Sequence, residues 1–301
     1  MFNPSFYAKS CLNAVSVWVF KVFPLMFPFF IFTRLIVNLN TPKQNFMDKF
    51  FNKLYHTPIS SFSTFFLATL SGYPMGAKLI CTMFENGQIT TKDAKKMLSF
   101  CSVSGPMFML GTVGIAMLNS FKAGVIILIS NIIASLINGI IYRGKNEKTN
   151  KNFKYISKDN NNLLAESVYD SLVSILMVGS YIVLSFILID ILNNLHITTF
   201  LSKIICSVCN INSHHDVVLS VLNGLIEITR GILDLSSSNI SLALKTIISS
   251  TLIGFGGVSI LLQSISFLSK VKISMKSIIL QKTTQSILCF IVTTLFCLMF
   301  L

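Results

Sequence analysis

The sequence predicts an all-α integral membrane protein, an inverted repeat of two halves that each contain three transmembrane helices and one re-entrant helical hairpin. Composition is the first observation: 52% of the 301 residues are hydrophobic and 12% are charged, against roughly 25% charged residues in a soluble domain. The second is a series of long apolar stretches, several of which reach the ~20 residues that a bilayer span needs. The third is a pair of broken apolar segments at matched positions in the two halves.

The apolar stretches give the elements in chain order. They lie at about 15–39, 59–84, 101–142, 168–195, 216–233, 242–269 and 277–301. The first lacks the small-residue cleavage site of a signal peptide, so we expect it to remain as the first span. In all we expect six spans, with hairpins formed by 59–84 and by 216–234 and its continuation. The lipid bilayer is therefore an expected partner.

A polar segment divides the chain. Residues 143–162 are rich in Lys and Asn and hold few apolar side chains, a composition typical of a flexible linker. We therefore predict three regions: a first membrane repeat at 1–142, a basic cytoplasmic linker at 143–164 and a second membrane repeat at 165–301.

Each half carries two breaks in its apolar pattern. Ser71 to Lys78 (Ser-Gly-Tyr-Pro-Met-Gly-Ala-Lys) is followed by Ser104 to Pro106, and Asn223 to Gly231 is followed by Gly254 to Gly257. The spacing from Gly72 to Gly105 is 33 residues, and that from Gly224 to Gly256 is 32. A helix broken by Pro or Gly leaves backbone groups unpaired, which is costly in lipid, so these breaks must face protein or water.

The net charge of +13 comes from lysines and arginines that cluster between the apolar stretches. Four clusters hold 16 of the 24 basic residues: Lys43, Lys49 and Lys53; Lys92, Lys95 and Lys96; Arg143, Lys145, Lys148, Lys151, Lys154 and Lys158; Lys270, Lys272, Lys276 and Lys282. With three crossings per half, all four clusters fall on one side, which the positive-inside bias makes cytoplasmic, with both termini outside. Loop clusters of this kind, without aromatic interleaving or a recognition motif, argue against nucleic acid as a partner.

The broken segments are the candidate binding site. Half-helix ends and free backbone carbonyls at the breaks can hold a solute near mid-membrane without burying charge. Alternatively, the glycines and Pro74 only permit tight helix packing. We expect the substrate-binding residues to be Ser71, Gly72, Tyr73, Pro74, Gly76, Lys78, Ser104, Gly105, Pro106, Asn223, Glu227, Thr229, Gly256, Gly257, Ser259 and Gln263.

Glu227 is the strongest single candidate in that set. It lies in an apolar run with no other carboxylate between Val217 and Leu233, and a carboxylate at membrane depth is unfavourable unless it is paired or faces water. The alternative is that an ion pair between Glu227 and Arg230 only stabilises the hairpin. Lys78 is open to three interpretations: pairing with an anionic solute, pairing with Glu227, or reaching to the membrane interface.

Other chemistry has weaker support in the sequence. Cys206 and Cys209, followed by His214 and His215 in an expected external loop, do not have the usual spacing of a zinc site, so we predict no metal and no cofactor. The chain has no Gly-x-Ser-x-Gly or His-Glu-x-x-His motif, and we predict that it is not an enzyme.

Several segments together resemble a known family. They are Phe27 to Phe32 (Phe-Pro-Phe-Phe-Ile-Phe), Ser71 to Lys78, Phe84 to Ile89 (Phe-Glu-Asn-Gly-Gln-Ile) and Leu98 to Pro106 (Leu-Ser-Phe-Cys-Ser-Val-Ser-Gly-Pro). With them the chain resembles the nucleoside-recognition (Gate) domain family, and within it the sporulation integral membrane proteins of the YlbJ type. The resemblance is strongest over about 20–140 and weaker over 165–301.

This resemblance implies a multi-pass protein of the bacterial cytoplasmic membrane that is needed during spore development and is distantly related to concentrative nucleoside transporters. The leading functional expectation is a transporter-like protein that moves or senses a small polar solute, nucleoside-like by family analogy. The alternative is a non-transporting membrane scaffold for spore envelope or cortex assembly. The solute, the coupling ion and a homo-oligomeric state are left open by the sequence.

Overall fold

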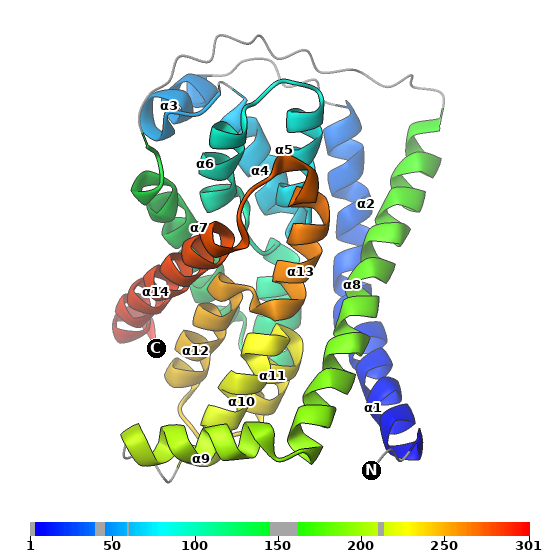
Figure 1. Ribbon diagram of the computed structural model, residues 1–301, viewed down its shortest axis with the longest axis vertical. Coiled ribbons are helices and arrows are strands. Elements are labelled where there is room, and N and C mark those ends of the chain that lie inside the picture. Colours follow the sequence, from blue (N-terminus) through cyan, green and yellow to red (C-terminus); the bar gives the residue numbers. More distant parts are fainter. Residues whose placement is uncertain (1–3, 40–45, 59, 145–161, 210–213) are drawn as a thin grey trace.

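The computed structural model describes residues 4–39, 46–58, 60–144, 162–209 and 214–301, and within these ranges the chain is almost entirely helical and contains no strand. Most of the predicted linker, with Lys145, Lys148, Lys151, Lys154 and Lys158, lies outside the described residues, as does Lys43. The helices α1 (Pro4–Val17), α2 (Phe23–Leu39) and α8 (Leu163–Asn194) run roughly along the long axis of the molecule (Figure 1). The helix α14 (Met275–Phe300) runs obliquely to it, and α9 (Ile197–Cys209) lies across one end.

The first half begins with one continuous helical rod and goes on through shorter helices. In order these are α1 (Pro4–Val17), the π-helical η1 (Trp18–Val22), α2 (Phe23–Leu39), α3 (Phe46–Tyr55), α4 (Ser61–Ser71), α5 (Met75–Glu85), α6 (Thr91–Cys101), the π-helical η2 (Phe108–Met117) and α7 (Phe121–Ile141).

The second half begins with the longest helix. Its elements are α8 (Leu163–Asn194), α9 (Ile197–Cys209), α10 (His215–Ile226), α11 (Ile228–Ser236), α12 (Leu242–Phe255), α13 (Gly257–Leu268), the 3-10 turn η5 (Ser269–Val271) and α14 (Met275–Phe300). The segment around Cys206, expected as an external loop, is therefore mostly the helix α9.

Five helical segments among the described residues are long and apolar enough to cross a membrane: Tyr7–Phe32, Phe121–Ile141, Leu163–Asn194, Leu242–Val271 and Met275–Phe300. Six were expected. The stretch 101–142 supplies only one of the five, because its earlier part forms the short helix Phe108–Met117 after a break that follows α6. Two of the shorter apolar helices, Ser61–Ser71 and His215–Ile226, belong to the segments predicted to form hairpins.

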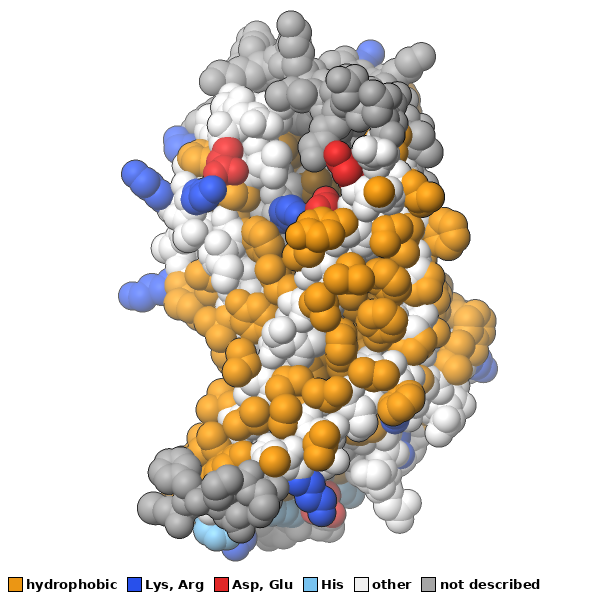
Figure 2. Space-filling view, turned by 90° about the vertical axis from the view of Figure 1, so that its right-hand side faces the viewer, with side chains coloured by type: hydrophobic (Ala, Val, Ile, Leu, Met, Phe, Trp, Pro, Cys, Tyr) orange, Lys and Arg blue, Asp and Glu red, His pale blue; other side chains and the backbone are white. Residues whose placement is uncertain are grey.

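The surface agrees with a bilayer as solvent. On the face drawn in Figure 2, hydrophobic side chains cover the middle of the molecule, while charged side chains gather towards its two ends. Large apolar side chains such as Leu184 and Leu295 are 64% and 58% exposed on long helices, an arrangement that is unfavourable in water and ordinary in lipid. The chain is a multi-pass membrane protein.

Short polar side chains fix where several helices begin. Thr90 and Asp93 form a reciprocal capping box at the start of α6, where the Thr90 hydroxyl accepts from the backbone of Asp93 and the carboxylate accepts from the backbone of Thr90. Ser120 and Ser241 accept backbone hydrogen bonds at the starts of α7 and α12. These caps pair amide groups that the first turn of a helix otherwise leaves free.

The two halves share their hydrophobic cores. One buried cluster joins α3 to α6 with Leu261, Leu268 and Ile278 of the second half. The other joins η1, α2, η2 and α7 with α8, α11 and α12. Small residues allow close approach between the halves: a Cβ at Gly179 of α8 would lie 2.5 Å from the Trp18 ring of η1.

The basic clusters within the described residues gather at one end of the molecule. The Nζ of Lys96 donates to the carbonyl of His56 at 3.0 Å, and the His56 ring lies 2.9 Å from the carbonyl of Gly144. At the same end Lys270 pairs with Glu85 at 2.6 Å, and Gln281 donates to the carbonyl of Lys95 at 2.9 Å. Segments far apart in the sequence therefore bring their positive charges together.

Candidate functional site

Four interruptions of helical structure meet near the centre of the molecule. They are residues 72–74 between α4 and α5, residues 102–105 after α6, Glu227 between α10 and α11, and Gly256 between α12 and α13. All four lie in segments predicted from the sequence to be broken. The breaks pack against one another, and this packing shields backbone groups for which lipid offers no hydrogen-bond partner.

In the first half, the turn between α4 and α5 packs directly on the break after α6. Gly72 has a φ of +70°, and a Cβ there would overlap the backbone nitrogen of Gly105 and lie 2.8 Å from its Cα. A Cβ at Gly76 would overlap the carbonyl oxygen of Cys101. Only glycine permits this backbone contact at either position.

Close contacts at glycines also occur in the second half. Gly224 of α10 and Gly231 of α11 approach so closely that a Cβ at Gly231 would overlap the Gly224 Cα. Gly256 has a φ of +92°, and a Cβ at Gly257 would lie 3.2 Å from the carbonyl oxygen of Ile226, at the end of α10. The hairpin of α10 and α11 thus packs on the break between α12 and α13.

A central cavity of about 50 Å³ lies where the four breaks converge. Its polar lining comes from three of the breaks, from the start of α11 and from α13, which follows the fourth break: Tyr73, Ser104, Gly105, Glu227, Thr229, Ser259 and Gln263. Its apolar lining comes from the η1 and α2 rod, η2, α8 and the starts of α11 and α13: Val22, Met26, Phe108, Val178, Ile182, Ile228 and Ile260. An apolar pocket with a few convergent polar groups is typical of small-molecule sites.

Glu227 caps the start of α11 and borders this cavity. Its carboxyl group accepts a 2.7 Å hydrogen bond from the backbone nitrogen of Arg230. The residue is 5% exposed. The helix start therefore stabilises a buried negative charge with backbone dipoles.

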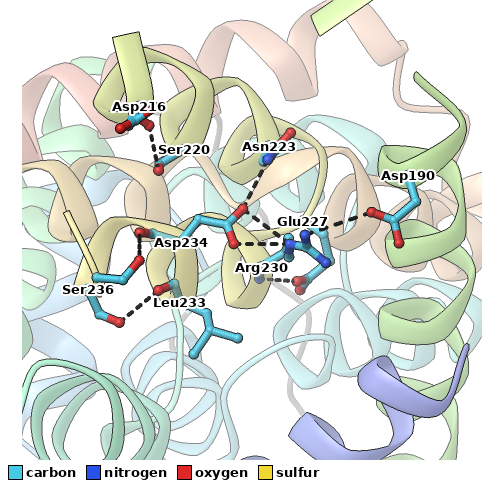
Figure 3. Close-up of polar contacts among 10 residues, drawn as sticks. Asp190, Asp216, Ser220, Asn223, Glu227, Arg230, Leu233, Asp234 and Ser236 are labelled. Carbon is cyan, nitrogen blue, oxygen red and sulfur yellow. Dashed lines mark hydrogen bonds and ion pairs between the residues drawn. The ribbon is translucent and has the colours of Figure 1, made fainter. Parts of the chain in front are cut away.

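The guanidinium of Arg230 pairs with two other acids (Figure 3). Its Nε donates to both carboxylate oxygens of Asp234 at 3.1 Å, and Nη2 lies 3.7 Å from Asp190 of α8. Asp234 also accepts from the Asn223 side chain at 3.0 Å. The ion pair between Glu227 and Arg230, which was the alternative interpretation of the sequence, is not among the ion pairs of the described residues, and the guanidinium instead joins a cluster of α10, α11 and α8.

A second cavity of about 110 Å³, which we call the Arg34 cavity, lies beside the first hairpin. Four predicted site residues line it: Ser71, Tyr73, Pro74 and Lys78. Arg34 of α2 closes one side by bonding Asp170 at 2.7 Å and Ser174 at 3.1 Å, both on α8. The first hairpin therefore contributes mainly to this cavity, and Tyr73 is the one residue within the described ranges that borders both cavities.

The remaining predicted site residues lie near the cavities without lining them. Gly72, Gly76 and Gly257 provide the close backbone contacts described above, and Gly256 has the positive φ at the break between α12 and α13. Asn223 faces Asp234, and its side-chain oxygen is buried without a hydrogen bond. Pro106 starts the helical segment that follows the break at residues 102–105.

Lys282 is a residue of the site region that sequence reasoning missed. It was expected in a cytoplasmic cluster with Lys270, Lys272 and Lys276, yet it is 4% exposed inside α14. Its Nζ donates to the Tyr73 hydroxyl at 2.5 Å and to the carbonyl of Ser102 at 2.6 Å. Its position inside the apolar stretch 277–301 was the available signal. Asp190, Asp234 and the Arg34 pair with Asp170 were also unanticipated.

The Cys and His residues near the end of α9 form no metal cluster in the described part of the chain. Cys206 is buried and Cys209 is exposed, and residues 210–213 lie outside the described ranges. The His215 ring lies 2.7 Å from the hydroxyl of Ser202, a contact within this end of the molecule.

Comparison with known proteins gives one similar curated protein. The chain is 24% identical to the sporulation integral membrane protein YlbJ of Bacillus subtilis (strain 168), across 95% of this chain and 76% of that protein. No protein-family model matches the chain. No solved structure matches it either.

Proposed function

We propose that this protein is transporter-like and moves or senses a small polar solute during spore development. The observation that carries the proposal is the convergence of four helix breaks on one cavity that a buried carboxylate borders. Broken helices offer half-helix ends and free carbonyls to a solute, and they occur in membranes where protein or a cavity covers them. The link to sporulation rests on the similarity to the Bacillus subtilis protein.

The proposal includes an inverted repeat. The hairpins α4–α5 and α10–α11 would enter from opposite faces and meet at the central cavity, and the basic end of the molecule would face the cytoplasm. Support comes from the matched packing of Gly72 on Gly105 and of Gly257 on the end of α10. The gathering of basic residues at one end supports the orientation.

The cavity also bears on the size of the solute. A water molecule needs about 10–15 Å³ of cavity volume, so about 50 Å³ accommodates a few waters. A nucleoside-sized solute, the class suggested by family resemblance, therefore requires the hairpins to separate. We take the structure to represent a closed state of the proposed transporter.

The scaffold alternative predicts a dry interface between the hairpins, packed by Gly, Ser and Leu. Glu227, Thr229, Ser259 and Gln263 instead place polar groups around a cavity, which favours the solute-binding interpretation. Within this lining, the Gln263 amide lies 3.4 Å from the Ser259 hydroxyl, a weak contact that a solute can replace.

A ligand screen by thermal unfolding of the detergent-purified protein tests the proposal. Nucleosides, dicarboxylates and other metabolites are added singly, because a specific ligand raises the unfolding temperature by mass action. We expect at least one to stabilise the wild type and to have little effect on Glu227→Gln. Asp216→Asn is the matched control, since this acid of α10 has a 94% exposed side chain and should leave the response intact. If no compound stabilises the wild type, or if the stabilisation survives in Glu227→Gln, the proposed site is wrong.

A further inference from the structure

The two cavities lie one after the other along the seam between α2 and α8. On α2 the lining passes from Arg34 and Phe30 in the Arg34 cavity to Met26 in the central cavity, and it continues to Val22 of η1. On α8 it passes from Asp170, Val173, Ser174 and Met177 to Val178 and Ile182. The residue numbers fall along α2 and rise along α8, so on both helices the lining leads from the Arg34 cavity to the central cavity.

Tyr73 stands between these cavities. It is the one residue, among those described, that lines both. It comes from the turn between α4 and α5, and it also reaches the second half, because a Cβ at Gly256 would lie 3.8 Å from its hydroxyl. A movement of this phenol therefore changes the wall shared by both cavities.

Lys282 holds the Tyr73 hydroxyl in place. The Nζ donates to that hydroxyl at 2.5 Å and also lies 4.6 Å from the centre of the Tyr73 ring. The hydroxyl donates in turn to the carbonyl of Ser102 at 3.0 Å, and the Nζ donates to the same carbonyl at 2.6 Å. Charged donors make stronger hydrogen bonds than neutral ones, and the ring adds a cation–π attraction.

The polar partners of the Lys282 ammonium are few. Its third donor bonds the Gln285 side chain at 3.2 Å, and no carboxylate among the described residues forms an ion pair with it. A buried ammonium without a counter-charge is unfavourable, so its three acceptors are its main compensation. Lys282 belongs to α14 of the second half, while Tyr73 and Ser102 belong to the first, so the contact joins the halves at the shared wall.

We propose that the Arg34 cavity and the central cavity are successive compartments of one path, that Tyr73 is the barrier between them, and that Lys282 is the residue that positions this barrier. The inference rests on the proposed function only in treating the path as a solute path. Separation of the Tyr73 hydroxyl from Lys282 opens the central cavity towards the end of the molecule where Arg34 lies.

Cysteine accessibility tests the barrier without any solute. The reporter is Ser259→Cys in the central cavity, in a background with Cys11 and Cys209 replaced by serine, since the other cysteines are buried. A small membrane-impermeant thiol reagent is added to membrane vesicles that expose the Arg34 end. We expect Tyr73→Phe and Lys282→Met each to raise the labelling rate of the reporter about tenfold, because each removes the charge-assisted hydrogen bond.

Two further variants make this result specific. Lys276→Met removes an exposed lysine from the same helix and should leave the rate unchanged. Met177→Trp, which fills the Arg34 cavity, should return the Lys282→Met rate towards that of the parent. The Tyr73→Phe and Lys282→Met double variant should label no faster than the faster single variant, since both act on one contact.

An unchanged rate in Tyr73→Phe, with its unfolding temperature retained, overturns the inference even if Lys282→Met fails to fold. A gain in rate that Met177→Trp does not reduce also overturns it, because the reagent then arrives by another route. Failure of the ligand screen is a separate result. Failure of the screen would count against solute binding, but it would not change the labelling rates of Ser259→Cys, which test the barrier.

Discussion

At the residue scale, two buried ionisable side chains near the centre of the molecule have different polar partners. Glu227 accepts a hydrogen bond from the backbone amide of Arg230 at the start of α11, which requires no partner charge. Lys282 receives a tyrosine hydroxyl, a backbone carbonyl and a glutamine oxygen. Neither side chain forms an ion pair between described residues, so both can bind a solute or water that reaches the cavities.

Glu227→Gln is expected to separate a site acid from a structural one. Glutamine keeps a side-chain oxygen that can cap α11, so the unfolding temperature should change little, while ligand-induced stabilisation is lost. Arg230→Gln should be the more destabilising change, by about 2 kcal/mol or more, because it leaves Asp190 and Asp234 without their cation. Both are measured by thermal unfolding with and without the ligand found in the screen.

The double variant Glu227→Gln with Arg230→Gln completes this cycle. A solute ligand predicts no recovery of ligand-induced stabilisation in the double variant, because the carboxylate is still missing. Recovery of stability and activity in the double variant would instead assign Glu227 to a structural pair with Arg230. The guanidinium contacts to Asp190 and Asp234 are the reason to expect the first outcome.

At the scale of elements, the hairpins depend on backbone contacts that side chains prevent. Gly72→Ala tests this, because it combines a φ of +70° with overlap against Gly105. Gly87→Ala is a matched control with a φ of +65° and nothing within 4 Å of the added Cβ. Both variants carry a positive-φ backbone penalty of about 1 kcal/mol or more, and it is larger at Gly72, whose ψ of −167° lies in a region that essentially only glycine adopts. We expect Gly72→Ala to lose roughly 2 kcal/mol more than Gly87→Ala, from this backbone conformation and from the overlap together.

Thermal unfolding of the two glycine variants in the same detergent decides the point. Gly76→Leu, whose Cβ would overlap the carbonyl of Cys101, should abolish function while the protein still reaches the membrane. Equal losses in Gly72→Ala and Gly87→Ala would show that the turn can move away from the break after α6. Normal function in Gly76→Leu would show that the first hairpin is not a tight functional element.

Polar contacts between α6, α7 and α14 provide a second test at this scale. The Asn138 amide donates to the carbonyls of Ser99 at 2.8 Å and Gln281 at 3.1 Å, and its oxygen accepts from Thr284 at 2.8 Å. Asn138→Ala should destabilise the fold by about 1–2 kcal/mol, since buried acceptors lose their donors. Ser130→Ala on the same helix is the control, because the buried Ser130 hydroxyl has no partner in the described structure. A loss from Ser130→Ala as large as that from Asn138→Ala would contradict the prediction.

At the scale of the whole molecule, the net charge of +13 is distributed unevenly between the two ends. The end with Lys96, Lys270 and Lys272 carries the basic clusters, while α9 at the opposite end exposes Lys203 beside apolar side chains. Under the proposed orientation the positive-inside bias puts the first end in the cytoplasm. Figure 1 shows the N-terminal helix α1 starting at the end with α9, which this orientation would place outside.

Single cysteines test this orientation. In the background lacking Cys11 and Cys209, Lys203→Cys should react with a membrane-impermeant thiol reagent in intact cells, and Lys272→Cys should react only after the membrane is permeabilised. Both positions are exposed in the structure, so a failure to react reports the membrane barrier and not burial. Reaction of Lys272→Cys in intact cells would reverse the proposed orientation.

Much of the architecture follows from the sequence because lipid imposes simple rules on it. Length and hydropathy identify the long helices, and Pro74, Gly72 and Gly256 mark where helices must break. The number of full spans could not be predicted from length and hydropathy in the same way. Residues 108–117 are as apolar as a span, but the break at 102–105 shortens their helix, and composition alone does not show how a short helix is packed.

The sequence by itself determined that the chain is a helical membrane protein, where its helices break, and that Glu227 is an acid in an apolar run. Those properties depend on local composition and on the solvent. Only the tertiary structure decided which breaks meet, that Arg230 turns to Asp190 and Asp234, and that Lys282 reaches Tyr73 across 209 positions of chain. A charged side chain inside a membrane requires a polar partner, and the sequence shows which side chains have this requirement. The identity of the partner depends on packing between helices that are distant in the chain.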